Sequence, residues 1–91
     1  MVKIEKVKAL TVGTSAQTVA VNGLAFVMEN LSESATVYFK EKRADGKAAT
    51  SSNGYALPAG KSTEFPMVAM DLSVVASAAS TDVRVLILEE V

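Results

Sequence analysis

Hydrophobic and polar residues alternate along most of the chain, and a period of two is the spacing of side chains on one face of a β-strand. In the stretch AQTVAVNG, Val19 and Val21 lie on one face and Thr18 lies on the other. Alternation resumes after Asn22-Gly23, a dipeptide typical of two-residue hairpin turns because both positions tolerate a positive φ angle. The pattern predicts a hairpin of strands 16–21 and 24–29. The apolar faces of these strands consist of Val19 and Val21, and of Leu24, Phe26 and Met28.

The middle of the chain predicts one further clear strand and then a polar loop. The stretch ATVYFKE, residues 35–41, alternates so that Val37 and Phe39 face inward. Residues 40–53 are polar and contain Asp45-Gly46. A charged segment with this dipeptide predicts an exposed turn or a longer loop.

The segment NGYALPAGKSTEFP, residues 53–66, contains both prolines of the chain. GYAL is expected to form a short strand and KSTEF its return strand. Between them, Pro58 supplies a fixed φ angle and Gly60 the freedom to reverse the chain. Pro66 is expected to end the return strand, because proline has no N–H group for the ladder. The clustered turn residues therefore predict two short strands and not a phosphate-binding loop.

Two segments fit both a strand and a helix. In residues 67–80, a helical stripe of apolar residues competes with a strand pattern, and strand is favoured because a Val-Val pair is a poor helix former. The SAAST stretch after it predicts a loop. The first ten residues have the same ambiguity, and a strand over 6–12 is preferred. With the last strand in DVRVLILEEV, about eight short strands are predicted, which is typical of an antiparallel β-sandwich or barrel.

The last strand is apolar on both faces. Val83, Val85 and Ile87 form one face, and Leu86 and Leu88 form the other. A strand with one wet face should alternate, so both faces of this strand are expected to be covered. A loop or the N-terminal strand of the same chain could cover the second face, or a neighbouring subunit could. Additional outward apolar residues favour the subunit. The candidate interface residues are Leu86, Leu88, Val27 and Val75.

Composition limits the chemistry that the chain can perform. The chain has 91 residues, enough for a single domain over 1–91, and it has no cysteine and no histidine. Disulfides, thiolate metal sites and the commonest general base are therefore absent. We predict no enzyme activity and no catalytic, cofactor-binding or metal-binding residues. The carboxylates do not single out a pair for glycoside hydrolysis, and a small hydrolase is the least favoured function.

The same totals bear on partners and location. The formal net charge is −1, which argues against nucleic acid as a partner. No apolar run is long enough to span a bilayer, and charged residues interrupt the N-terminus where a secretory signal would be apolar. We therefore expect no membrane association and synthesis in the cytoplasm. Candidate residues for binding at the surface are Tyr38, Tyr55 and Arg43.

Four stretches together resemble a group of small phage and prophage virion proteins. These stretches are VGTSAQTVAV, VMENLSESATVYF, SSNGYALPAGKSTEF and DLSVVASAASTDVRVLILE, and they cover nearly all of the chain after residue 9. The resemblance implies a jelly-roll-like β-sandwich of the capsid decoration or head-fibre type, located in the virion, often trimeric and associated with a phage capsid or another virion protein. Within the predicted single domain, segment 1–8 is expected to be extended or exchanged between copies. The polar loop 40–53 is longer than the resemblance to these virion proteins leads us to expect.

A second class of function remains open from the sequence. A carbohydrate- or cell-surface-binding β-sandwich module would use exposed aromatic rings, for which Tyr38, Tyr55 and Phe65 are candidates. Only 5% of the residues are aromatic, which disfavours a broad sugar-binding platform.

Overall fold

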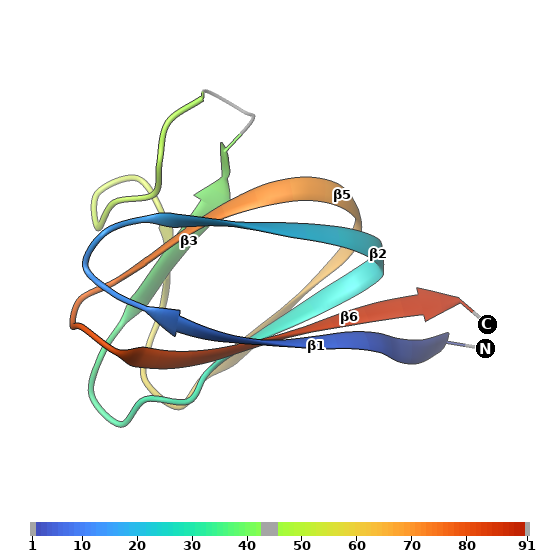
Figure 1. The fold of residues 1–91 in the computed structure, drawn as a ribbon, viewed down its shortest axis with the longest axis horizontal. Helices are drawn as coiled ribbons and strands as arrows, with labels where there is room; N and C mark the ends of the chain where they lie inside the picture. Colours follow the sequence, from blue (N-terminus) through green and yellow to red (C-terminus); the bar gives the residue numbers. More distant parts are fainter. Residues whose placement is uncertain (1, 43–45, 91) are drawn as a thin grey trace.

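The computed structural model describes the backbone of residues 2–42 and 46–90, and the side chains of 7–20, 25–42, 46–64 and 71–87. The described residues form six strands joined by turns and loops (Figure 1). The strands are β1 (Val2–Val12), β2 (Gln17–Asn30), β3 (Val37–Glu41), β4 (Tyr55–Leu57), β5 (Ser62–Ala76) and β6 (Thr81–Glu90). All neighbouring strands are antiparallel, in the order β1-β6-β2-β5-β3-β4. The all-β antiparallel prediction is confirmed.

The two longest strands, β2 and β5, each pass through both layers of a sandwich. Residues 17–23 of β2 pair with 68–74 of β5, and β3 extends this layer by pairing with 72–76. Residues 25–29 of β2 pair with 62–66 of β5, and there β6 lies on the other side of β2. Figure 1 shows β2 and β5 curving together between the two layers. The shortest extent of the Cα atoms is 16 Å, which fits two sheets stacked about 10 Å apart.

When each half of β2 and β5 is counted separately, the chain contains the eight short strands that the sequence predicts. One layer contains β1, β6, the second half of β2 and the first half of β5. The other contains the first half of β2, the second half of β5, β3 and β4. Two four-stranded antiparallel layers wound in this way form a jelly roll. The jelly-roll-like prediction is therefore confirmed.

The predicted hairpin turn at Asn22-Gly23 is wrong. Both residues are paired within β2, with Ala69 and Val68 of β5. The Asn-Gly signal describes local backbone preference, but here the partner strand continues alongside, so the ladder is kept through the bend. The position marks where the chain changes layers and not where it reverses.

Pro66 does not end a strand, contrary to the sequence prediction. It is paired with Ala25 in the middle of β5. The first half of β5 is the edge of its layer, since β3 joins β5 only at residues 72–76. A proline is tolerated on an edge strand because the side of that strand without a neighbour needs no N–H donor. The two ambiguous segments, by contrast, are strands as favoured, and β1 begins four residues earlier than predicted.

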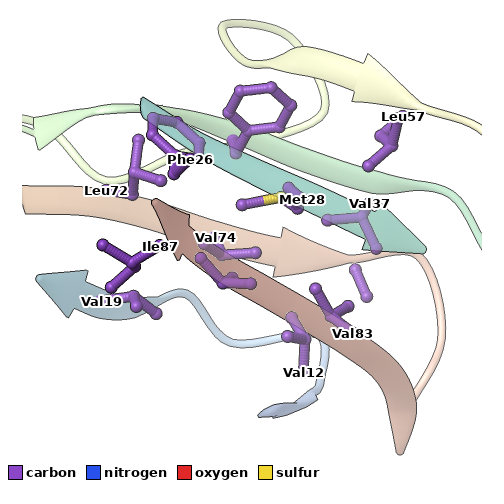
Figure 2. Packing of buried hydrophobic residues seen from close by; sticks show 13 residues of the cluster. Val12, Val19, Phe26, Met28, Val37, Leu57, Leu72, Val74, Val83 and Ile87 are labelled. Carbon is purple, nitrogen blue, oxygen red and sulfur yellow. The ribbon is translucent and has the colours of Figure 1, made fainter. Parts of the chain in front are cut away.

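Buried apolar side chains from both layers form one continuous core (Figure 2). As predicted, Val83, Val85 and Ile87 of β6 all face this core. The cluster consists of Val12, Val19, Phe26, Met28, Val37, Phe39, Leu57, Leu72, Val74, Ala76, Val83, Val85 and Ile87. Each fully buried aliphatic side chain contributes about 1.5–3 kcal/mol, so this core is the main source of stability.

The side of β2 that faces the core changes along the strand. Val19 is buried in the first half, whereas Phe26 and Met28 are buried in the second half. The register with β5 is constant from Gln17 to Glu29, so a residue at an odd position and one at an even position lie on opposite faces of the ladder. The ribbon of β2 and β5 therefore presents opposite faces to the core in the two layers.

The Pro-Ala-Gly turn is tied to a buried asparagine. Gly60 has a φ angle of 74°, and the Lys61 amide donates to the Pro58 carbonyl over 3.1 Å, as expected for a tight turn. The Gly60 amide donates to the backbone carbonyl of Asn30 over 2.9 Å. The Asn30 side chain is 1% exposed and donates to the carbonyl of Leu57, immediately before the turn, over 2.9 Å. The turn therefore docks onto the end of β2.

Gly54, the residue before β4, leaves little space for a side chain. A Cβ at this position would lie 3.1 Å from the Phe39 amide nitrogen and 3.2 Å from the Thr50 carbonyl oxygen, both of which belong to the backbone. We expect Gly54→Ala to lower the free energy of unfolding by about 1–3 kcal/mol in urea titrations followed by circular dichroism. Gly13→Ala is the matched control, since a Cβ there meets nothing within 4 Å, and equal losses for the two variants would contradict the packing described here.

Candidate functional site

Three apolar side chains form a row across the outer face of one layer. Val7 of β1 is paired with Leu86 of β6, and Leu86 is paired on its other side with Val27 of β2. Directly paired residues in an antiparallel ladder lie on one face, with Cβ atoms about 4.5–5.5 Å apart. Because Val85 and Ile87 face the core, this row faces outward. Val7 is 59% exposed and the other two are half-buried. We call Val7, Leu86 and Val27 the Leu86 row.

Charged residues flank the Leu86 row. Glu64 of β5 is paired with Val27, at the β5 end of the row. In the adjacent register row, Arg84 is paired with Glu29, and its guanidinium also forms an ion pair with Asp82. An apolar centre with a charged border is the usual arrangement of a protein–protein interface.

The other two predicted interface residues are placed differently. The side chain of Leu88 lies outside the described residues, and its backbone is paired with Ala25. Val75 is only 9% exposed and lines a groove together with residues 48–51 of its own chain. The Ala49 amide donates to Ser73 Oγ over 2.8 Å, which fixes that loop against the outer face of β5. Val75 therefore contributes to packing within the protomer.

Sequence reasoning did not identify Val7, which is the most exposed member of the Leu86 row. Its segment fits a helix as well as a strand, and the strand boundary at residue 6 gave no register with β6. The available signal was that β6 is apolar on both faces. Because β6 is paired on both sides, its outward face is continuous with the outward faces of both neighbouring strands. Val7 becomes visible only when β1 is aligned with Leu86.

The two tyrosines among the predicted surface-binding residues do not come together. Arg43 lies outside the described residues. Tyr38 is half-buried on the outer face of β3 and lines the groove that contains Val75. Tyr55 is 70% exposed and stacks on Phe39, with ring centroids 5.9 Å apart. The two tyrosines therefore belong to separate hollows of the surface.

A cleft of about 210 Å³ lies beside Tyr55, and we call it the Tyr55 cleft. Its apolar lining comes from three core residues on three strands: Phe26 of β2, Phe39 of β3 and Leu72 of β5. Figure 2 shows Phe26 and Leu72 close together at one end of the core. The polar residues that line the cleft are Lys40, Glu41 and Asn53. The sequence offered no signal for these three, since their meeting depends on the register of β3 with β4 and β5.

The described part of the chain contains no cluster of metal ligands. No group of three or more histidine, cysteine, aspartate or glutamate residues there is arranged to hold a metal ion. Every buried side-chain nitrogen or oxygen of the described residues has a hydrogen-bond partner. None of the described residues forms a helix long and apolar enough to cross a lipid bilayer.

Comparisons with models of protein families, with curated proteins and with solved structures find no match for this chain. Functional proposals therefore rest on the chain's own residues and geometry.

Proposed function

We propose that this protein is a non-enzymatic structural protein of a phage or prophage particle, of the capsid decoration or head-fibre type. It is made in the cytoplasm of the bacterial host and is located in the virion. Copies of the chain associate through the outer face of β1, β6 and β2, and a trimer is the favoured assembly. The observation that supports this proposal most directly is the Leu86 row.

The energetics of the Leu86 row favour a partner. Three adjacent apolar side chains on the outer face of a sheet gain free energy when they leave water, about 25 cal/mol for each Å² of apolar surface. Single exposed apolar residues are normal, but Val7, Leu86 and Val27 are neighbours in one register row. The border of Glu64, Glu29 and Arg84 supplies charges of both signs, which can set the orientation of a second copy.

The fold is compatible with a particle protein. Jelly rolls occur in viral capsid domains and also in lectin domains. The fold by itself does not distinguish a capsid function from a lectin function, so the properties of the surface have to distinguish them. The resemblance of the sequence to small virion proteins adds to the capsid alternative. Association with a capsid or another virion protein would use the same surface or its border.

We expect Leu86→Glu to dissociate the assembly. A carboxylate in the centre of the row would lose water without gaining a partner, which costs several kcal/mol in a packed interface. Light scattering coupled to size exclusion should show an oligomer for the unchanged protein and a monomer for Leu86→Glu. Thr18→Glu is the control, because Thr18 is exposed on the other layer, and this variant should remain oligomeric.

A second measurement tests the particle itself. The unchanged protein should sediment with purified capsids of the phage or induced prophage that encodes it, and Leu86→Glu should sediment less. A chain that is monomeric at every concentration and stays in the supernatant with capsids would refute the proposal. A major capsid or portal gene beside the coding sequence would support it.

A further inference from the structure

The Tyr55 cleft has the size and floor of a site for one small ring. Its volume is about 210 Å³, and a cavity of about 150 Å³ is large enough for benzene. Phe26, Phe39 and Leu72 are each at most 4% exposed and provide an apolar floor at the end of the core. Mouths of β-barrels and similar closed sheets are frequent places for ligand sites.

Tyr55 provides an exposed aromatic wall for the cleft. It is paired with Phe39 across β3 and β4, so both side chains lie on the inner face of their layer. The rings are stacked with an interplanar angle of 29°, which supports the tyrosine ring on one side. With 70% of the residue exposed, the rest of the ring is accessible to a ligand. The core therefore holds Tyr55 in place as a flat surface.

The polar residues among the described lining of the cleft are Lys40, Glu41 and Asn53, and the Lys40 ammonium donates to the Lys47 carbonyl over 3.0 Å. Asn53 is oriented by its loop, since it accepts from the Thr50 amide over 2.7 Å and donates to the Ala48 carbonyl over 3.1 Å. A primary amide has two N–H groups and two oxygen lone pairs. The Asn53 side chain can therefore form a further bond at each end.

We propose that the Tyr55 cleft binds one pyranose ring of a carbohydrate. A pyranose has an apolar C–H face that fits the tyrosine ring and the floor, and hydroxyl groups around its edge that fit the donors and acceptors of the border. A purely apolar ring would leave the remaining N–H group and oxygen lone pair of the Asn53 amide without a hydrogen bond, and uncompensated burial of such groups is costly. This site shares no residue with the Leu86 row, so it does not depend on the proposed self-association.

The proposal is tested first on a glycan array with the full chain, and then by titrating the methyl glycoside of the retained sugar into isotope-labelled protein. Amide resonances of Phe39, Lys40 and Asn53 should shift, while those of Val75 should not. Tyr55→Ala should weaken binding at least about tenfold, because one stacked ring is lost. Tyr55→Phe keeps the ring and should bind within about threefold of the unchanged protein.

Tyr38→Ala is the matched control, because it removes a tyrosine from the other hollow and should leave affinity unchanged. The spectra of Tyr55→Phe and Tyr55→Ala also report whether each variant is folded. Three results would each overturn the proposal: no glycan retained on the array, sugar shifts confined to residues outside the cleft, or equal affinity in folded Tyr55→Ala. Binding of phenol in the cleft without any sugar binding would identify an apolar pocket instead.

Discussion

Replacing Asn30 with alanine is expected to lower the free energy of unfolding by about 2–4 kcal/mol. For a domain of this length, such a loss lowers the melting temperature by roughly 10–30 °C. Total stabilities of small domains are only about 5–15 kcal/mol, so part of the variant population could be unfolded at 37 °C. Differential scanning calorimetry and urea titration of the same samples measure the effect.

The reason for this large effect is the number of buried groups that depend on one amide. Asn30 Nδ2 donates to the carbonyl of Ala35 over 2.8 Å and to that of Leu57 over 2.9 Å. Its Oδ1 accepts from the Ser32 amide over 3.1 Å. A side chain that is 1% exposed leaves no room for water to replace these bonds. Removing the amide therefore takes this partner from the Leu57 carbonyl and the Ser32 N–H group, while the Ala35 carbonyl keeps a bond from the Ser32 hydroxyl. Each group left without a partner costs about 1–3 kcal/mol if it stays dry.

Asn53→Ala is the control for this prediction. The Asn53 side chain also bonds to two backbone groups, the Thr50 amide and the Ala48 carbonyl, but it is exposed. Water can take over both bonds, so we expect a loss of at most about 1 kcal/mol. Equal losses for the two variants would show that burial of the Asn30 amide does not account for its contribution.

Asn30 also shows the limit of what the sequence could predict. Alternation placed the valines and the isoleucine of β6 correctly, because the direction of a side chain on a strand depends only on its position in the strand. A buried asparagine needs partners, and one of its partners, Leu57, is 27 residues away in the chain. Only the register between β2, the loop after it and the Pro-Ala-Gly turn brings these groups together.

The bend in β2 and β5 illustrates a different limit. From the sequence alone, Asn22-Gly23 and Pro66 predict that a strand ends, because both interrupt regular pairing in isolated strands. In the structure they lie within two strands that remain paired with each other. Each signal reflects a local backbone preference, but the pairing with the partner strand determines whether the strand ends there. The prediction of eight strands is confirmed because each of these breaks coincides with a change of layer.

The candidate sites depended even more on tertiary structure. The sequence identified Leu86, Val27 and Tyr55 as candidates, but it gave no pairing that would add Val7 to the first two or Phe39 to the third. The sequence predicts Val75 to be a subunit-interface residue, because nothing in its own segment indicates that residues 48–51 of the same chain lie over it. That contact depends on a serine hydroxyl of β5 and an alanine amide of the loop.

Substitutions along β2 should show directly that the strand changes its core-facing side. Met28 is fully buried, and we expect Met28→Ala to cost about 2–5 kcal/mol in urea unfolding. Val19→Ala should cost about 1–3 kcal/mol, because Val19 is buried between the layers. Val27→Ala makes the same chemical change at another odd position of the same strand. It should cost less than about 1 kcal/mol, since Val27 lies on the outer face.

The two valines separate this fold from a simpler one. In a straight strand that keeps one face to the core, Val19 and Val27 would be equally buried, and the two losses would match. In the jelly roll, the ribbon of β2 and β5 changes its inner face between them, so the loss at Val19 should exceed that at Val27. Val27 belongs to the Leu86 row, so both variants should be measured at a protein concentration where the chain is monomeric. Equal losses for the two valines under that condition would exclude the change of layer within β2.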